Sequence, residues 1–254
     1  MSGLLDGRVA IVTGAGQGVG EGIARALASA GAAVVIAARR ADNGEPAAAA
    51  IRARGATATF VRCDVTAEAD VDAVVMHTIG DHGRLDVVIH NAVSPPGPPG
   101  PVQAVDPDTI TNQIATSTTA TYLFGRAAHP HLAATGGTFI VLTSPAGMEG
   151  SGNLPVYATV KGAQRGMLKS LAREWGPDGI RVNAIAPVAW TPAMTAATDA
   201  NPTLQARLEA RTPLGRIGDP EADIGPVAVF LASDMARHMT GQTMAVDGGR
   251  YLGL

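Results

Sequence analysis

A tyrosine and a lysine lie four residues apart in Tyr157-Ala-Thr-Val-Lys161, and a serine precedes them at Ser144. Residues four apart share one face of a helix, so Lys161 can lie beneath the Tyr157 hydroxyl. An ammonium near a phenol favours the phenolate and lowers the tyrosine pKa from its usual value of about 10. Tyr157 would then be a general acid or base, and Ser144 could hydrogen-bond a substrate oxygen above it. Because this spacing alone is usually just an exposed helix face, the interpretation depends on the rest of the chain.

Short β-branched segments alternate with longer alanine-rich helical patterns. The expected strands are residues 9–12, 34–37, 59–62, 87–90, 139–142, 182–185 and 243–246. Helical patterns cover about 18–30, 45–54, 67–82, 108–134, 155–176 and 221–233. This alternation predicts right-handed crossovers and a parallel sheet with helices on both faces. No repeat or linker interrupts the series, so we expect a single α/β domain over residues 1–254.

Two segments interrupt this rhythm. Ser94-Pro-Pro-Gly-Pro-Pro-Gly-Pro101 can be neither helix nor inner strand. The stretch from Pro187 to about Pro213 is predicted to be a long connection, of the kind that is usually a binding loop or disordered. Both follow the carboxyl ends of expected strands, where open α/β sheets place their ligands.

A glycine-rich segment, Thr13-Gly-Ala-Gly-Gln-Gly-Val-Gly20, lies between the first strand and the first helix. Glycines there let the backbone approach a pyrophosphate, which binds the free N–H groups at the helix N-terminus. Its position at the start of a βαβ unit predicts dinucleotide binding. The residues expected to hold the cofactor in this loop are Gly14, Gln17, Gly18, Val19 and Gly20.

The second and third strands carry candidates for the adenosine end of that cofactor. Arg39 and Arg40 follow the second strand, which offers no carboxylate for a ribose 2′-hydroxyl. Two guanidinium groups suit a 2′-phosphate, so NADP(H) is expected to be preferred, with NAD(H) possible; the alternative is a solvated basic pair. Asp64 could accept from the adenine amine, and Thr66 is better placed than Asp64 to cap the following helix.

Composition excludes several classes of protein. Charged residues make up 16% of the chain, the net charge is −3, and no basic run exceeds the pair Arg39-Arg40. We therefore expect no nucleic-acid partner. Cys63 is the only cysteine, so no intramolecular disulfide can form and no metal site is expected. The apolar runs are too short to cross a bilayer, and no leader pattern precedes the first strand, so we expect a cytoplasmic protein without a membrane partner.

Taken together, these residues resemble the short-chain dehydrogenase/reductase family over essentially the whole chain. The resemblance implies a single-domain Rossmann fold, in which a doubly wound parallel sheet of seven strands has helices on both faces. It also implies a nicotinamide cofactor and a homotetramer. The matching motifs are Thr13-Gly-x-x-x-Gly18-x-Gly20, Asp64-Val65, Asn91-Ala92, Ser144, Tyr157-x-x-x-Lys161, Arg181-Val-Asn183, Pro187, Thr191 and Thr240-Gly-Gln-Thr-Met-Ala-Val-Asp247-Gly-Gly249.

The resemblance also implies roles for individual residues. Tyr157 would transfer the proton, Ser144 would hold the substrate oxygen, and Lys161 would lower the tyrosine pKa and bind the nicotinamide ribose. Hydride would pass directly between the nicotinamide and the reacting carbon. Residues that would line the cofactor elsewhere are Asn91 and Ala92 on the adenosine side, and Pro187, Val188 and Thr191 along the nicotinamide.

Three positions depart from the family pattern. Val93 replaces the glycine of Asn-Ala-Gly, and Val188 replaces the glycine after Pro187, with a shorter step to Thr191. The third departure is Ser117, which stands at the fourth catalytic position in place of an asparagine. In the family that asparagine helps to hold a water that relays protons to the lysine. A kinked backbone carbonyl and the serine hydroxyl could replace it.

The segments expected to face a substrate are mostly apolar. They are residues 94–101, Met148, Glu149, Leu154, Trp190, Met194 and parts of 195–212. They suit an apolar ketone or secondary alcohol, although each Met and Leu could equally be core packing. We therefore expect an NAD(P)(H)-dependent oxidoreductase that interconverts such compounds. The alternatives are a 3-oxoacyl thioester reductase acting on acyl carrier protein or CoA derivatives, and a cofactor-binding sensor with vestigial catalysis.

Overall fold

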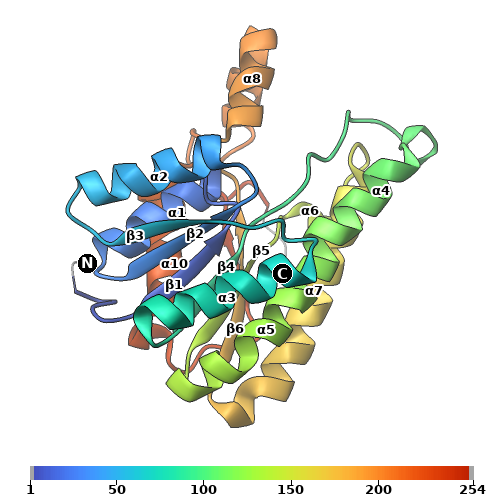
Figure 1. Ribbon diagram of the computed structural model, residues 1–254. Helices are drawn as coiled ribbons and strands as arrows, with labels where there is room; N and C mark the ends of the chain where they lie inside the picture. Colours follow the sequence, from blue (N-terminus) through green and yellow to red (C-terminus); the bar gives the residue numbers. More distant parts are fainter. Residues whose placement is uncertain (1–2, 252–254) are drawn as a thin grey trace.

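The computed structural model describes residues 3–251, except for the side chains of Ala193 and Pro202. Seven strands form one parallel sheet in the order β3-β2-β1-β4-β5-β6-β7 (Figure 1). The strands are β1 Val9–Thr13, β2 Ala33–Ala38, β3 Ala58–Arg62, β4 Val87–His90, β5 Thr138–Leu142, β6 Arg181–Pro187 and β7 Thr243–Val246. Each predicted strand lies within an observed one, so the doubly wound parallel sheet of seven strands is confirmed.

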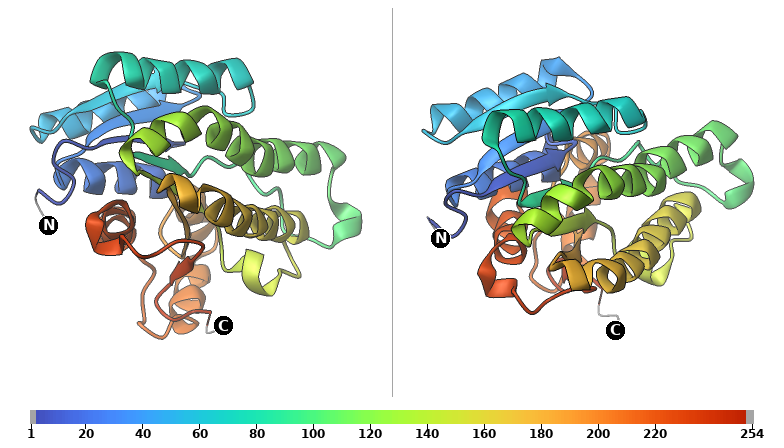
Figure 2. Two further views of the ribbon diagram at one scale, coloured as in Figure 1. Left: turned by 90° about the horizontal axis from the view of Figure 1, so that it is seen from below. Right: turned by 60° about the horizontal axis from the view of Figure 1, so that its bottom comes forward.

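Helices cover both faces of this sheet (Figure 2). One face carries α1 Gly18–Ser29, α2 Ala41–Ala53 and α10 Gly225–Ala232; the other carries α3 Glu68–His82, α5 Ala120–Thr135 and α7 Pro155–Trp175. Neighbouring strand residues face opposite layers: Ala10 and Val12 pack on the first, and Ile11 packs on the second. A strand covered on both sides must be apolar throughout, which explains the uninterrupted Val-Ala-Ile-Val of β1.

The shorter helices are α4 Pro107–Gln113, α6 Ala146–Glu149, α8 Pro192–Ala200 and α9 Pro202–Ala210. Short 3₁₀ turns are η1 Val102–Ala104, η3 Gly176–Asp178 and η5 Asp234–Ala236, and η4 Pro220–Ile224 is a π-helical turn. The helix α2 begins four residues before its predicted start at 45. Within residues 3–251, no helix combines the length and apolarity needed to cross a lipid bilayer.

The predicted helix over 108–134 is three consecutive segments. A π-helical turn, η2 Ile114–Thr119, separates α4 from α5. The N–H of Ala120 bonds to the carbonyl of Ala115, five residues back, which is the π-helical pattern. Ser117 lies inside this widened turn and is fully buried. Apolar periodicity cannot reveal such a turn, because the flanking helices continue in nearly the same direction.

The predicted long connection between residues 187 and 213 is wrong, because the segment contains α8 and α9. Each helix begins with a capping side chain followed by proline at its first position. The Thr191 hydroxyl accepts from the Met194 N–H at 3.2 Å, and Asn201 Oδ1 accepts from the Thr203 N–H at 3.2 Å. The prolines of this segment therefore start helices. In Figure 1, α8 projects from the edge of the sheet.

The predicted irregular course of Ser94–Pro101 is confirmed. Its backbone is held by side chains from the neighbouring helical segment. The Gln113 amide donates to the carbonyls of Ser94 and Pro95 at 2.9 and 2.8 Å. The Ser94 N–H donates to the Thr116 hydroxyl at 3.1 Å. These bonds replace the ladder that the prolines cannot form.

Candidate active site

The predicted site residues follow the carboxyl ends of six strands. Because all strands run in parallel, these ends lie at one edge of the sheet. The residues just beyond the strand ends are Gly14 after β1, Arg39 after β2, Asp64 after β3, Asn91 after β4, Ser144 after β5 and Val188 after β6. The fold thus brings segments far apart in sequence to one edge of the molecule.

The glycine-rich loop packs directly on the end of β4. Gly14 and Gly18 have φ angles of +63° and +60°, a left-handed conformation that favours glycine. A Cβ on Gly14 would lie 2.8 Å from the Cα of Ala92. The Asn91 amide donates to the carbonyls of Thr13 and Gly14 at 3.0 and 3.2 Å. Asn91 therefore fixes the loop at its start.

The loop ends at an uncapped helix N-terminus. Gln17 is the cap residue of α1 in extended conformation, and its side chain makes no capping bond. The residues that open the helix are Gly18, Val19 and Gly20. A Cβ on Gly18 would lie 3.3 Å from Pro192 Cδ, so the loop also lies beside the start of α8. Bare glycine backbone at the start of a helix fits the pyrophosphate of a dinucleotide.

A buried histidine joins the loop to the π-helical turn. The Thr13 hydroxyl accepts from the N–H groups of Asn91 and Ala92, each at 3.0 Å, so its own hydrogen points to His90 Nδ1 at 3.1 Å. His90 Nε2 then donates to the Thr116 carbonyl at 3.2 Å. Burial lowers the pKa of His90 to about 3, so the ring is neutral. Sequence reasoning missed His90, whose only signal was a polar residue ending an apolar strand.

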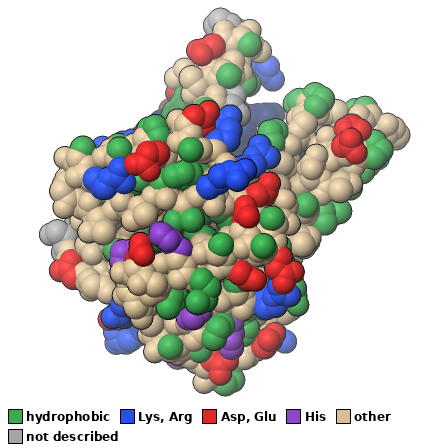
Figure 3. All heavy atoms as spheres, in the orientation of Figure 1, with side chains coloured by type: hydrophobic (Ala, Val, Ile, Leu, Met, Phe, Trp, Pro, Cys, Tyr) green, Lys and Arg blue, Asp and Glu red, His purple; other side chains and the backbone are tan. Residues whose placement is uncertain are grey.

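Exposed arginines lie where the adenosine end of the cofactor is expected. Basic side chains gather near the ends of β2 and β3 on the face shown in Figure 3. Arg40 Nε pairs with Asp42 Oδ1 at 3.3 Å, whereas Arg39 has no ion pair among the described residues. Arg39 is therefore the better placed of the two for a phosphate.

Asp64 is partly engaged within its own turn. Its Oδ1 accepts from the N–H and the hydroxyl of Thr66 at 3.0 and 2.7 Å. These bonds, with Arg39 nearby, hold the pKa of Asp64 below its usual value. The helix α3 is preceded by Ala67 as its cap residue, so the predicted capping role of Thr66 is wrong. The neighbouring Val65 is buried.

The end of β6 extends along β7. The N–H of Val188 donates to the Val246 carbonyl at 3.0 Å, and the Val188 carbonyl accepts from Gly218 at 3.2 Å. Pro187, Val188 and Thr191 thus leave the sheet as an ordered segment that ends at the cap of α8. The valine in place of glycine is accommodated by this strand-like pairing.

Ser144 and Tyr157 meet beyond β5. Ser144 Oγ accepts from the Ala146 N–H at 3.2 Å, and its side chain lies close enough to Tyr157 to affect the tyrosine pKa. Burial raises the pKa of Tyr157 above its usual value, while the nearby Ser144 hydroxyl acts against this rise. The predicted lowering of the Tyr157 pKa is therefore wrong in this structure, because removing the phenol from water outweighs the stabilisation of its anion.

Lys161 lies on the same face of α7 as Tyr157, as predicted. Its Nζ is 5.8 Å from the centre of the Tyr157 ring, and its exposed fraction is 2%. Nζ donates to the Leu142 carbonyl at 2.6 Å and to Gln164 Oε1 at 2.9 Å. Burial lowers the pKa of Lys161 to about 7. Near neutral pH the group is thus divided between ammonium and amine, which weakens its effect on the tyrosine.

Ser117 reaches this cluster only through its backbone. Its carbonyl accepts from Gln164 Nε2 at 3.2 Å and from the Thr121 hydroxyl at 2.6 Å. Its hydroxyl, although buried, has no hydrogen-bond partner among the described residues. The expected kinked carbonyl is present, but the serine hydroxyl makes no bond to the lysine. Sequence reasoning missed Gln164, which is three residues after Lys161 on the same helix face.

The predicted substrate-facing residues form a mixed surface. Glu149 is exposed, and the apolar residues Met148, Leu154, Trp190 and Met194 are half-buried. The N–H of Gly100 donates to the Asn153 carbonyl at 2.9 Å. This bond brings the 94–101 segment against the segment that precedes α7.

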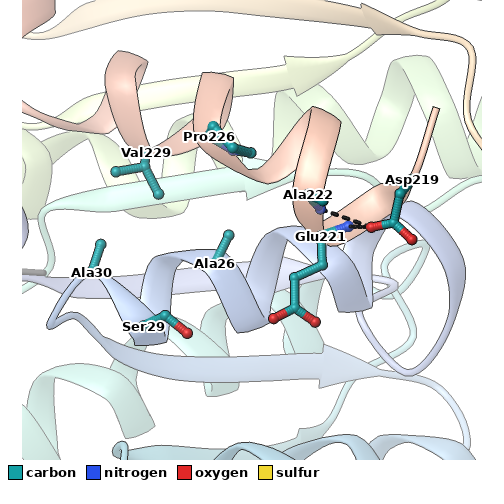
Figure 4. Close-up of a pocket in the computed structure, with 8 residues that line it drawn as sticks. All are labelled: Ala26, Ser29, Ala30, Asp219, Glu221, Ala222, Pro226 and Val229. Atoms are coloured by element: carbon teal, nitrogen blue, oxygen red, sulfur yellow. Dashed lines mark hydrogen bonds between the residues drawn. The ribbon is translucent and has the colours of Figure 1, made fainter. Parts of the chain in front are cut away.

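A hollow of about 540 Å³ lies elsewhere, between α1 and the α10 region (Figure 4). Asp219 at its rim accepts from the N–H groups of Glu221 and Ala222. It is lined by Ala26, Ser29, Ala30, Asp219, Glu221, Ala222, Pro226 and Val229. None of these is a predicted site residue, so the hollow is separate from the candidate active site.

Comparison with known proteins agrees with this geometry. A family described as enoyl-(acyl carrier protein) reductase matches residues 14–250. L-fucose dehydrogenase from Oryctolagus cuniculus is 39% identical over 251 residues, covering 97% of this chain and 86% of that protein. A 12alpha-hydroxysteroid dehydrogenase from Clostridium sp. is 35% identical over 255 residues, covering 97% and 98%. A 3-ketoacyl-(acyl-carrier-protein) reductase from Brucella melitensis, solved with NADH, superimposes with a TM-score of 0.88, at 32% identity and 97% and 99% coverage.

The chain therefore belongs to the short-chain dehydrogenase/reductase family. It is an oxidoreductase that acts on CH–OH groups, and NAD(P) is the cofactor typical of this family.

We predict that Gly14→Ala weakens NAD(P)H binding at least tenfold, because the new Cβ forces the loop away from Ala92. Titration calorimetry measures the dissociation constant. Gly7→Ala is the matched control: its φ is +72°, so it carries a similar left-handed strain of roughly 1–2 kcal/mol, but no atom lies within 4 Å of its Cβ. Equal cofactor affinity in both variants would show that the loop does not hold the pyrophosphate.

Proposed function

We propose that this protein interconverts an apolar ketone and a secondary alcohol, with Tyr157 as general acid and base. The observation that carries the proposal is the placement of Ser144 and Tyr157 beside buried Lys161, at the sheet edge that also holds the glycine-rich loop. A bound nicotinamide supplies or removes the hydride.

The roles of the three side chains follow from their contacts. The Ser144 hydroxyl lies near that of Tyr157, so both groups can reach one substrate oxygen. Tyr157 gives its proton to that oxygen in reduction and removes it in oxidation. Two of the three N–H donors of Lys161 are bound to Leu142 and Gln164, and the third has no partner among the described residues. That third donor is available to the tyrosine or to a cofactor ribose.

The other cofactor contacts follow from the strand ends. Gly14, Gln17, Gly18, Val19 and Gly20 would hold the pyrophosphate. The adenosine would lie near Arg39, Arg40, Asp64, Val65, Asn91 and Ala92, and the nicotinamide near Pro187, Val188 and Thr191. Because Arg39 is exposed and the strand end lacks a carboxylate, we propose that NADP(H) is preferred over NAD(H).

An apolar substrate is supported by the side chains around the Ser144–Tyr157 pair. Met148, Leu154, Trp190 and Met194 are half-buried, so each has surface left to contact a ligand. Among the relatives, one is named as a 12alpha-hydroxysteroid dehydrogenase, whereas another is named as an L-fucose dehydrogenase. Reduction of a 3-oxoacyl thioester is the second candidate, supported by the likeness to the Brucella enzyme.

We also propose that the protein is a cytoplasmic homotetramer. The α4–η2–α5 segment leaves several large apolar side chains exposed, including Ile114 at 46% and Tyr122 at 55%. Contact with a second copy through this segment would remove them from water.

We predict turnover by wild-type protein in a panel of apolar ketones, secondary alcohols, sugars and 3-oxoacyl thioesters, followed by NAD(P)H absorbance. The apolar ketones and alcohols should give the highest kcat/KM. Tyr157→Phe should lower kcat at least a hundredfold without changing NADPH affinity, because it removes only the transferable proton. Highest kcat/KM on thioesters would favour the second candidate. Tight NADPH binding without turnover on any compound would instead favour a sensor.

We predict that Arg39→Asp raises the NADPH dissociation constant at least tenfold and leaves that of NADH unchanged or lower. The substitution removes a guanidinium and places a carboxylate near the expected 2′-phosphate. Arg173→Asp, on the exposed surface of α7, carries the same change in net charge and serves as the control. An unchanged ratio of NADPH to NADH affinity in Arg39→Asp would contradict the preference for NADP(H).

A further inference from the structure

The buried amine of Lys161 depends on two neutral acceptors. Its Nζ donates to the Leu142 carbonyl at the end of β5 and to Gln164 Oε1 one turn along α7. Taking an ammonium out of water is costly unless hydrogen bonds replace its hydration. The Leu142 acceptor is a backbone carbonyl, which a side-chain substitution does not remove. Gln164 therefore supplies the only side-chain acceptor that Lys161 has among the described residues.

The orientation of the Gln164 amide is fixed by its other contacts. Gln164 Nε2 donates to the Ser117 carbonyl at 3.2 Å and to the Thr121 hydroxyl at 2.9 Å. Thr121 gives its own hydrogen to the Ser117 carbonyl at 2.6 Å, so towards Gln164 it can only accept. Both N–H donors of the amide are thereby used, and Oε1 must face Lys161. A flipped amide would put N–H against the ammonium.

The π-helical turn makes this arrangement possible. The Ser117 carbonyl in this turn accepts from Gln164 on α7 and from Thr121 on α5. Ser117, Thr121 and Gln164 are all buried, with exposed fractions of 0, 0 and 1%. These three residues and Lys161 form a buried cluster, in which the Ser117 hydroxyl and the third N–H donor of Lys161 have no partner among the described residues.

We propose that Gln164 is a positioning residue for the reaction: its amide joins Lys161 to the π-helical turn and takes the place that an asparagine and its water have in the resembling family. The inference rests on the proposed function for its catalytic meaning. Its physical content, that Gln164 holds the protonated lysine, can be tested without turnover. A neutral amide accepts the hydrogen bond but does not readily pass a proton on, so Gln164 favours the ammonium form of Lys161 without relaying protons to it.

Few other groups affect the charge of Lys161. Among the described residues, the titratable groups facing it are Tyr157 on its own helix and His90 at the end of β4. His90 is neutral over the working range, because its pKa is about 3. Burial already lowers the Lys161 pKa to about 7, and loss of the Gln164 acceptor should destabilise the ammonium and lower this pKa further. A carboxylate at position 164 should instead raise the Lys161 pKa.

The chain offers a direct measurement, because Lys161 and Lys169 are its only two lysines. Protein labelled with ¹³C at the lysine ε-carbon gives two signals, and exposed Lys169 is an internal reference. We predict that the Lys161 midpoint falls by about one to two pH units in Gln164→Met, which keeps the side-chain length, and rises in Gln164→Glu. Thr121→Val should lower the Lys161 midpoint less, since it removes only one of the two acceptors that orient the Gln164 amide.

Gln113→Met is the matched control, since it removes another buried glutamine beside the π-helical turn without touching Lys161. Its Lys161 midpoint should equal that of wild type. An unchanged midpoint in Gln164→Met, or shifts of the same sign in Gln164→Met and Gln164→Glu, would overturn the proposal. If Gln164→Met does not fold, the near-isosteric Gln164→Glu still decides, because a carboxylate in place of the Oε1 that faces Lys161 should raise the midpoint, and an unchanged midpoint would contradict the contact.

Activity gives a second measurement on whichever substrate the panel identifies. In alcohol oxidation the reacting form has Tyr157 ionised and Lys161 protonated, and in Gln164→Met the tyrosine pKa should rise while the lysine pKa falls. Because the tyrosine pKa already lies above the lysine pKa, the two limbs of the pH profile move apart, the reacting form becomes scarcer, and kcat falls about tenfold at neutral pH while KM changes little. An unchanged pH profile would contradict the catalytic part of the proposal. If no compound turns over, the proposed function fails, whereas the NMR midpoints still test the contact itself.

Discussion

The burial of one amine constrains the catalytic end of this molecule. Lys161 is removed from water, and an ammonium there is tolerated only with acceptors on several sides. The last carbonyl of β5 supplies one, and Gln164 on α7 supplies another. The second is held in turn by a carbonyl of the π-helical turn. Hydrogen bonds therefore connect three features around Lys161: the end of β5, the register of α7 and the widened turn before α5. A shift of one of them would break a bond to another.

Most of the fold could be predicted because a parallel sheet covered on both faces needs apolar, β-branched strands, and these are visible in the sequence. The helices α8 and α9 could not, because proline is ambiguous: after Thr191 and Asn201 it starts a helix, whereas in the 94–101 segment it prevents one. The candidate catalytic residues were proposed from their types and spacing. The pKa of Tyr157 was not, since burial, which decides its direction, is a property of the folded molecule. Gln164 was missed because its importance arises from a carbonyl 47 residues away.

At the carboxyl edge of the sheet, the proposed cofactor side and the proposed substrate side differ in the groups that form them. On the proposed cofactor side, the structure is set by backbone: glycines packed against β4, an uncapped helix start and the Thr13 hydroxyl, which accepts from two N–H groups. On the proposed substrate side, side chains come from segments outside the sheet, including α6, the 94–101 segment and the start of α8. Relatives named for a sugar and for a hydroxysteroid match this chain over 97% of its length, and folds of this kind take different substrates through differences in such segments.

The buried imidazole of His90 makes the stability of this edge of the sheet depend on pH. Its pKa is about 3 in the folded chain, against an ordinary value near 6.5, so between these limits only the unfolded chain carries its proton. Unfolding in mild acid therefore takes up a proton at this position, and the free energy of unfolding declines as pH falls from about 6.5 towards 3. A ring charged in place would also lose its bond from Thr13, because Nδ1 could no longer accept. Acid would thus loosen the junction between the glycine-rich loop and the π-helical turn, the same junction that orders both halves of the site.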